Sequence, residues 1–209
     1  MHHLTFVCIV VFSAKRKEGI LKEVILTVGP QGSGKSSFCE KAVALDPSLT
    51  LISRDKILYE LFGSVFLDAY SGGHYHAYEV MWERVKEQVE ATSDSRIILD
   101  TWNGGSRERR AIIERLRELG VGRVVAWYFV TPVETVSEWF WNKPGIAKSS
   151  EMCARSGQGL TFFSDKAPKH DYKLFHKWAR DIDLDGFDEV VRINPLVTTP
   201  EQVLGLEPA

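Results

Sequence analysis

A run of consecutive residues has the types and the spacing of a phosphate-binding loop. It is Gly29-Pro30-Gln31-Gly32-Ser33-Gly34-Lys35-Ser36, which reads G-x-x-x-x-G-K-S. Glycines let the backbone curl so that successive N–H groups point at phosphate oxygens. Lys35 would reach the β- and γ-phosphates, and the Ser36 hydroxyl would bind Mg²⁺. The pattern predicts a site for ATP with Mg²⁺. The residues expected to bind ATP are Gly29, Gln31, Gly32, Ser33, Gly34, Lys35, Ser36 and Ser37.

This loop requires a strand before it and a helix after it. Residues 24–28 form an apolar run that reads as a buried strand, and residues 37–45 can form a helix. The N-terminus of that helix would add its partial positive charge to the phosphate site. A glycine-rich turn arising by chance is the alternative. The order of strand, loop and helix is the context that the motif needs.

A candidate metal ligand ends a strand predicted further along the chain. Residues 96–100 include an apolar run that ends in Asp100, which is the Walker B pattern downstream of a phosphate-binding loop. Asp100 is expected to hold Mg²⁺ through water or to accept a hydrogen bond from Ser36. The metal ligands predicted from the sequence are therefore Ser36 and Asp100.

Another carboxylate lies at the end of a further strand. Residues 49–52 read as a strand that runs into Ser53-Arg54-Asp55. Ligands bind at the carboxyl ends of the strands in open α/β sheets. Asp55 is therefore a candidate functional residue, and Arg54 is a candidate substrate contact. The alternative is that Asp55 caps the N-terminus of a helix over residues 56–62.

Two arginines occupy the first turns of a helix expected over residues 106–119, with Ser106 as its cap. Cations near a helix N-terminus oppose the helix dipole, so one of Arg109 and Arg110 is a candidate for facing a phosphate. The alternative is a solvated charge. The residues of this helix expected to face inward are Ile112, Ile113, Leu116 and Leu119.

Local sequence patterns predict two further helices. Residues 74–91 place several apolar side chains on one face, which is expected to be core. These side chains are Tyr75, Tyr78, Trp82, Val85 and Val89. Thr131-Pro132-Val133-Glu134 reads as a capping box with proline at the first helical position, so a helix is predicted from there to about residue 142.

The region from Lys143 to Arg180 differs in charge from the rest of the chain. Its cations are Lys143, Lys148, Arg155, Lys166, Lys169, Lys173, Lys177 and Arg180, and its anions are Glu151, Asp165 and Asp171. The chain as a whole has a net charge of -2. This local excess of cations, with several glycines among them, predicts a lid over anionic ligands. A solvated helix face is the alternative, and it is preferred for most of residues 169–177.

The composition and the order of elements indicate the fold class. The 209 residues are 44% hydrophobic and 26% charged, as in one ordinary globular domain. Candidate strands alternate with candidate helices, which predicts the α/β class. The expected architecture is a P-loop NTPase fold, with a mostly parallel sheet of about five strands flanked by helices and a lid. The expected parts are a flexible N-terminal extension at 1–22, the P-loop domain at 23–195 with its lid at 143–180, and a C-terminal tail at 196–209.

Bulk properties also bear on partners and location. A net charge of -2 gives no overall preference for nucleic acid or for an anionic membrane. Cys8, Cys39 and Cys153 have no metal-ligand spacing, and their odd number suits a reducing compartment. Residues 4–12 are apolar but too short to span a bilayer, and basic residues follow them instead of preceding them. We expect a cytoplasmic location and no membrane partner.

Together these stretches resemble the kinase domain of phage-type polynucleotide kinases, within the zeta-toxin-like, AAA_33-type group of P-loop proteins. The likeness covers roughly residues 23–145. It rests on residues 25–29 and 32–36, then on Ser53-Arg54-Asp55, and then on Asp100-Thr101 with Arg109-Arg110. In that family the aspartate after the second strand deprotonates a nucleic acid 5′-hydroxyl. The resemblance therefore implies that Asp55 is the catalytic base, beside Lys35, Arg109 and a lid cation such as Arg155.

The chain also departs from that family. Leu58 stands where the family has an arginine on the substrate side. Residues 139–142, with two tryptophans and a phenylalanine, stand where lid arginines are expected. Lys143 and Lys148 become the candidate substrate contacts, although lysine lacks the bidentate fork of arginine. The aromatic residues would offer a face on which a terminal base stacks, or they are core on the lid helix.

The activity expected from these features is ATP-dependent transfer of the γ-phosphate to a hydroxyl. The first candidate acceptor is a polynucleotide 5′-hydroxyl. A small molecule or a nucleotide-sugar is the alternative acceptor within the same group. A nucleotide-binding ATPase that transfers no phosphate is the competing class of function.

Overall fold

A computed structural model describes residues 22–67, 71–91, 94–149 and 161–206. At its centre is a five-stranded sheet in the order β2-β3-β1-β4-β7, and each neighbouring pair runs parallel. The strands are β1 (Glu23–Val28), β2 (Leu49–Ser53), β3 (Arg96–Asp100), β4 (Arg123–Phe129) and β7 (Glu189–Ile193). The predicted α/β class with a mostly parallel sheet is confirmed.

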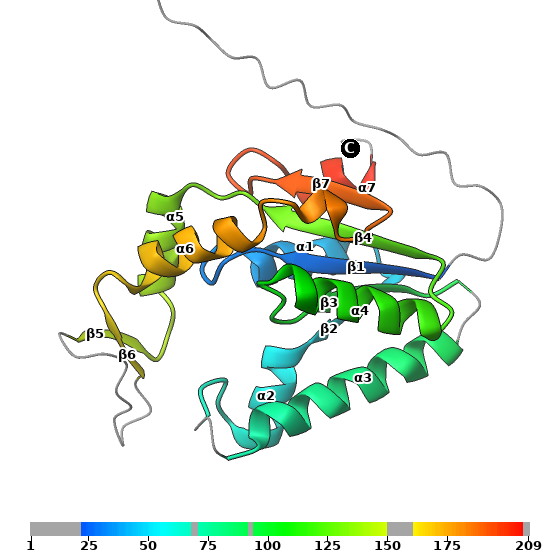
Figure 1. The fold of residues 1–209 in the computed structure, drawn as a ribbon, viewed down its shortest axis with the longest axis horizontal. Helices are drawn as coiled ribbons and strands as arrows, with labels where there is room; N and C mark the ends of the chain where they lie inside the picture. Colours follow the sequence, from blue (N-terminus) through cyan, green and yellow to red (C-terminus); the bar gives the residue numbers. More distant parts are fainter. Residues whose placement is uncertain (1–21, 68–70, 92–93, 150–160, 207–209) are drawn as a thin grey trace, which may run out of the picture.

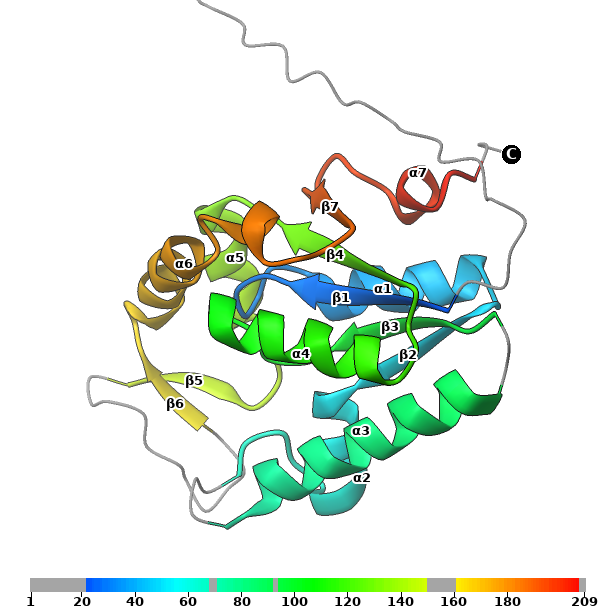
Figure 2. The same ribbon diagram turned by 45° about the vertical axis from the view of Figure 1, so that its right-hand side comes forward.

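Helices cover both faces of this sheet (Figures 1 and 2). One face packs against α3 (Gly73–Ala91) and α4 (Ser106–Glu118), and the other packs against α1 (Lys35–Leu45) and α7 (Pro200–Leu204). Successive side chains of a strand point to opposite faces. Leu26 therefore enters the core on the α3 and α4 side, whereas Ile25 enters the core beside α1.

The carboxyl edge of the sheet carries the segments that surround the phosphate-binding loop. Helix α2 (Arg54–Phe62) follows β2, and α5 (Val133–Trp141) follows β4. A small parallel pair, β5 (Ile146–Ser149) and β6 (Thr161–Ser164), projects from this edge and leads into α6 (Ala167–Trp178) (Figure 1). The predicted lid corresponds to β5, β6 and α6. Helix α6 is anchored, because Phe175 lies in the main core.

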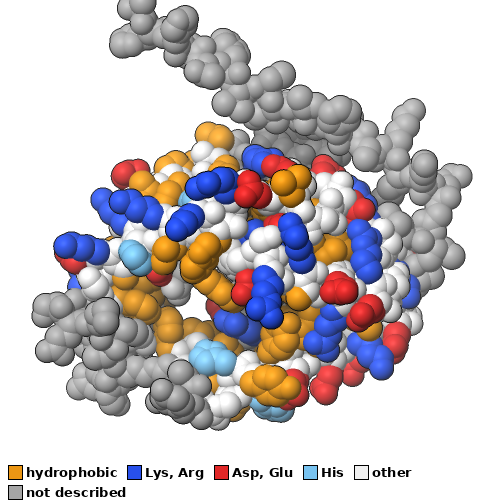
Figure 3. All heavy atoms as spheres, in the orientation of Figure 1, with side chains coloured by type: hydrophobic (Ala, Val, Ile, Leu, Met, Phe, Trp, Pro, Cys, Tyr) orange, Lys and Arg blue, Asp and Glu red, His pale blue; other side chains and the backbone are white. Residues whose placement is uncertain are grey.

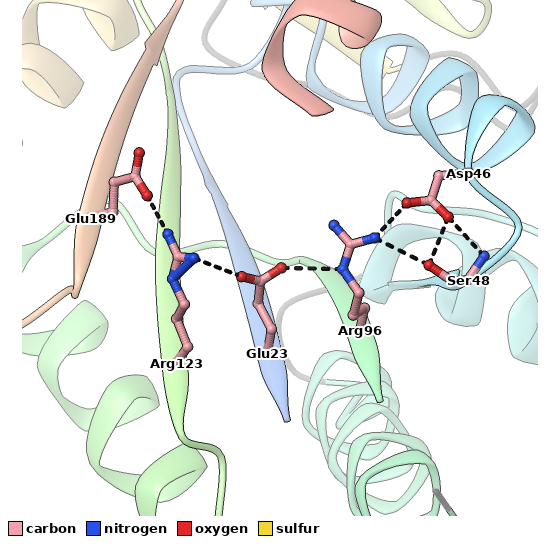
Figure 4. Close-up of polar contacts among 6 residues, drawn as sticks. All are labelled: Glu23, Asp46, Ser48, Arg96, Arg123 and Glu189. Carbon is pink, nitrogen blue, oxygen red and sulfur yellow. Dashed lines mark hydrogen bonds and ion pairs between the residues drawn. The ribbon is translucent and has the colours of Figure 1, made fainter. Parts of the chain in front are cut away.

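At the opposite, amino edge, charged side chains bridge the strands (Figure 4). Glu23 of β1 lies in register with Arg96 of β3 and with Arg123 of β4. Its carboxylate accepts from Arg96 at 3.3 Å and from Arg123 at 3.1 Å. Arg96 also pairs with Asp46, and Arg123 also pairs with Glu189 of β7. One chain of ion pairs thus links four strands.

The structure corrects several local predictions. Tyr75 is 68% exposed, because the buried stripe of α3 is centred nearer Met81 and Val85. Thr131 forms no helix cap, because its hydroxyl donates to the Ser33 carbonyl at 2.7 Å. Part of the segment expected as a tail forms α7, which begins with a capping box at Thr199 and packs on the core. In the described ranges no helix has the length and hydrophobicity needed to cross a bilayer.

Candidate active site

The phosphate-binding loop connects β1 to α1 and requires glycine at two positions. Gly32 and Gly34 have φ values of +86° and +87°, a region that other residues rarely adopt. Space is also lacking, since a Cβ on Gly32 would lie 2.7 Å from the Val136 carbonyl oxygen. A Cβ on Gly34 would lie 2.8 Å from the Trp139 ring. The loop therefore has its backbone conformation because of the motif glycines.

Lys35 is folded over this loop. Its Nζ donates to the carbonyls of Gly29 at 2.8 Å and Pro30 at 3.0 Å. Burial lowers the pKa of Lys35, while the carboxylates of Asp100 and Asp55 oppose that shift. The charges of both carboxylates singled out from the sequence therefore act on this ammonium.

The loop fits a phosphate chain. The Ser33 hydroxyl is buried and has no hydrogen-bond partner, so it is a free donor inside the loop. Ser36 and Ser37 lie in the first turn of α1, where helix N–H groups are unpaired. Gln31 lies half-buried on the loop. A triphosphate would supply acceptors for these groups.

Asp100 ends β3 beside the loop. Its carboxylate accepts from the Thr27 hydroxyl at 2.7 Å and from the Ser36 hydroxyl at 3.2 Å. A serine hydroxyl with one carboxylate suits Mg²⁺, which completes its shell with water and substrate phosphates. The described part of the chain holds no cluster of three or more His, Cys, Asp or Glu side chains. Ser36 and Asp100 are the residues that would hold the ion.

Asp55 lies in the first turn of α2, at the carboxyl end of β2. The structure makes Ser53 the N-cap of this helix, so the alternative role of Asp55 as the cap is wrong. The Asp55 side chain is 64% exposed, and its nearest cation is Arg54 at 3.5 Å. It borders a pocket of about 370 Å³ that Ser36 also lines. A carboxylate thus faces the same space as the candidate metal ligand.

Of the two predicted lid cations that the structure describes, Lys143 is the one whose pKa is affected by groups of the candidate site. Burial lowers the pKa of Lys143 and the nearby Lys35 ammonium lowers it further, while Asp55 and Asp100 oppose the shift. Lys148 instead lies over the Trp141 ring, 5.1 Å from its centroid. Arg155 lies outside the described residues.

Arg109 was predicted to face a phosphate, but the structure places it inside the protein. Its side chain is fully buried, and its Nε pairs with Asp185 at 2.6 Å. Its other two nitrogens donate to the carbonyls of Asn103, Gly104 and Trp178. The catalytic role expected for Arg109 is therefore wrong, because all three guanidinium nitrogens bind groups inside the protein.

Arg109 instead ties α4 to the end of α6. Its partner Asp185 also accepts from Ser106, which begins α4 instead of capping it. Arg110 is the exposed neighbour, 3.5 Å from the same carboxylate. Asp185 lies far along the chain, and no local pattern marks it as the partner of this arginine.

The sequence reasoning also missed two polar residues that hold the site. Asn103 donates to the carbonyls of Thr27 at 2.7 Å and Thr101 at 3.1 Å, which fixes the loop after β3 to β1. Thr131 holds the phosphate-binding loop through Ser33. Both follow strands at the carboxyl edge, a position that could have marked them as site residues.

The three aromatic residues at the end of α5 have different surroundings. Phe140 is fully buried, so it offers no face for a stacked base. Trp139 packs on the phosphate-binding loop at Gly34, near Pro195. Trp141 is half-buried beneath Lys148. The alternative of a core role holds for Phe140 alone.

Comparisons with known proteins agree with this architecture. Among solved structures, the tunicamycin resistance protein of Deinococcus radiodurans is 13% identical, with 90% of this chain and 99% of that chain covered and a TM-score of 0.55. Shikimate kinase from Acinetobacter baumannii is 14% identical, with 88% of each chain covered and a TM-score of 0.51.

A chain of the Pnkp1/Rnl/Hen1 complex is 13% identical, with 86% of this chain and 81% of that chain covered and a TM-score of 0.51. At these identities the likeness concerns the fold, which is that of P-loop kinases. No curated protein matches the sequence. Residues 24–152 match the family AAA_33, described as an AAA domain. The match spans more than half of the chain, and the chain therefore belongs to the AAA_33 family.

Proposed function

We propose that this protein is an ATP-dependent kinase that transfers the γ-phosphate to a hydroxyl group. One observation carries the proposal: four charged side chains from different elements converge at the carboxyl edge. The Ser36 hydroxyl donates to Asp100 at 3.2 Å and lines one pocket with Asp55. The charges of Asp100 and Asp55 also oppose the lowering, by burial, of the pKa values of Lys35 and Lys143. A phosphate-binding lysine, a metal-binding carboxylate, a candidate base and a lid cation thus share one site.

Each group has a separate role in this proposal. The loop N–H groups and Lys35 bind the phosphates, while Ser36 and Asp100 hold Mg²⁺, which would neutralise charge on the β- and γ-phosphates. Asp55 takes the proton of the acceptor hydroxyl. The acceptor oxygen bonds to the γ-phosphorus, the bond from the γ-phosphorus to the β–γ bridging oxygen breaks, and ADP leaves. Lys143 stabilises the negative charge of the transferring group.

Two acceptor classes are compatible with this chemistry. The resemblance to phage-type polynucleotide kinases favours a polynucleotide 5′-hydroxyl. A small hydroxyl compound is the second candidate, and one specific observation favours it. Leu58, at the position where that family has a substrate-side arginine, is fully buried in the core. The substrate side of α2 therefore presents no cation at that position.

Replacing the candidate base tests the proposal. Asp55→Asn should lower phosphate transfer by roughly 100-fold or more, because a positioned base is lost, while ATP binding remains. Glu60→Gln is the matched control, since Glu60 is a carboxylate lining the same pocket. Label transfer from γ-labelled ATP measures the rate, and calorimetry measures ATP binding. A normal rate of phosphate transfer by Asp55→Asn would refute the role of Asp55 as the catalytic base. ATP hydrolysis without transfer to any hydroxyl would favour the ATPase alternative.

A further inference from the structure

A pocket beside the candidate base offers a place for the acceptor. It lies between the start of α1 and helix α2 and has a volume of about 370 Å³, within the usual range for small-molecule sites. Its lining residues are Ser36, Ser53, Asp55, Lys56, Tyr59, Glu60 and Val65. A hydroxyl in this pocket would lie between the candidate metal ligand Ser36 and the carboxylate of Asp55.

The charge of this lining does not suit a polyanion. It contains the two carboxylates of Asp55 and Glu60 and one ammonium, that of Lys56, so the formal sum is one negative charge. Lys56 is already paired with Glu40 at 2.8 Å. Nucleic acid binding depends on cations that neutralise backbone phosphates. The one cation of the lining is thus already paired, and Arg54, which lies 3.5 Å from Asp55, is not among the lining residues.

The uncharged part of the lining suits a ring or an aliphatic face. Tyr59, which is 66% exposed, is an aromatic residue of the lining, and Val65 is an aliphatic one. Figure 3 shows the molecule hollowed between the β5–β6 projection and the helices α2 and α3, with hydrophobic side chains along much of the border. An apolar ligand face would gain contact area there, with about 0.5–1.5 kcal/mol more when it stacks on an aromatic ring.

We propose that the acceptor is a small, uncharged hydroxyl compound whose ring or aliphatic face packs on Tyr59 while its hydroxyl lies at Asp55. This inference rests on the proposed kinase function and selects one of its two acceptor classes. It assigns Tyr59 the role of binding the acceptor without taking part in the chemical step.

The first test asks which class of molecule receives the label. Wild-type protein and Asp55→Asn are incubated with γ-labelled ATP and Mg²⁺, and with either the small-molecule fraction or the nucleic acid fraction of a deproteinised cell extract. We expect the wild type to label the small-molecule fraction. Phosphatase should release the label as inorganic phosphate and leave an unlabelled, uncharged hydroxyl compound that mass spectrometry can detect. Nuclease-sensitive label in the nucleic acid fraction, with salt-dependent transfer, would overturn the inference and leave the kinase function intact. Label in neither fraction would refute both.

The second test uses two exposed tyrosines. Tyr59→Ala should raise KM for the labelled acceptor roughly three- to tenfold and leave KM for ATP and kcat unchanged, because only ring contact with the acceptor is lost. Tyr75→Ala is the matched control, since Tyr75 is equally exposed but lies on α3, outside the pocket lining. An unchanged acceptor KM in Tyr59→Ala would overturn the inference. Loss of transfer in Asp55→Asn would still support the kinase.

Discussion

The two edges of the central sheet use charged residues in opposite ways. At the amino edge, Glu23 is nearly buried between Arg96 and Arg123, and these charges satisfy one another. At the carboxyl edge, the Ser33 hydroxyl has no partner and the Asp55 carboxylate is largely exposed. Buried polar groups are normally paired. The buried Ser95 hydroxyl at the amino edge is also unpaired, so what distinguishes Ser33 is its place inside the phosphate-binding loop, where a ligand would complete its bonding. The comparison separates an edge that stabilises the fold from an edge that is arranged for a substrate.

The largest effect on activity is expected at the carboxyl edge. Lys35→Ala should abolish phosphate transfer and weaken ATP·Mg²⁺ binding roughly 10- to 100-fold, because charged hydrogen bonds to phosphate are lost. The melting temperature should change little. Calorimetric titration and a thermal melt measure the two quantities, with Lys41→Ala on the exposed side of α1 as control. Binding of ATP with unchanged affinity would refute the phosphate site.

The largest effect on stability is expected at the buried pair of Arg109 and Asp185. This pair is an exception to the contrast between the edges, because it stabilises the fold although Arg109 was predicted to act in the active site. Arg109→Met should lower the free energy of unfolding by about 3–5 kcal/mol, because it leaves the Asp185 charge buried without its main partner. Arg110→Met, one position along the same helix, should cost far less because Arg110 is 60% exposed. Urea unfolding of both variants compares them. Equal losses would contradict the structural role assigned to Arg109.

A smaller loss of stability is expected at the amino edge. Glu23→Gln removes the charge that faces both Arg96 and Arg123, and should cost about 2 kcal/mol in the free energy of unfolding. The kinetic constants should be unchanged, because the edge lies across the sheet from the site. Urea unfolding and steady-state kinetics give the two readings. A large fall in kcat would contradict the proposal that the amino edge contributes to stability and not to activity.

The smallest effect concerns pH. Burial and the nearby Lys35 ammonium lower the pKa of Lys143, so its charge is lost at a lower pH than that of an ordinary lysine. Arginine keeps its charge throughout this range. Lys143→Arg should therefore extend activity to higher pH and change little near neutrality. The pH profile of kcat tests this, with Lys148→Arg as the control. An alkaline limb that does not move would show that Lys143 does not set it, and would leave Lys35, whose pKa burial also lowers, as the titrating lysine.

The elements that local patterns define were predicted well from the sequence. β3 has the expected bounds and β1 begins one residue before the expected run, since each is an apolar run in the centre of the sheet, and the glycine pattern located the loop between β1 and α1. Asp100 contacts Ser36 as predicted, because parallel strands bring their carboxyl ends to one edge.

The errors concern residues whose partners are distant in the chain. Arg109 is read locally as a cation at a helix start, but its position is set by Asp185, which lies in the turn after α6. Thr131 has the local pattern of a helix cap, yet the Ser33 carbonyl is the acceptor it bonds. Local propensity yields to tertiary contacts when burial makes those contacts obligatory.

The central place of β1 in the sheet also determines when the chain can fold. The ribosome makes β1 first, but its two neighbours, β3 and β4, begin only at Arg96 and Arg123. Sheets whose partners are far apart in the chain form slowly, and unpaired apolar strands invite association between chains. The strand that leads into the phosphate-binding loop therefore keeps an open edge until β4 has been synthesised.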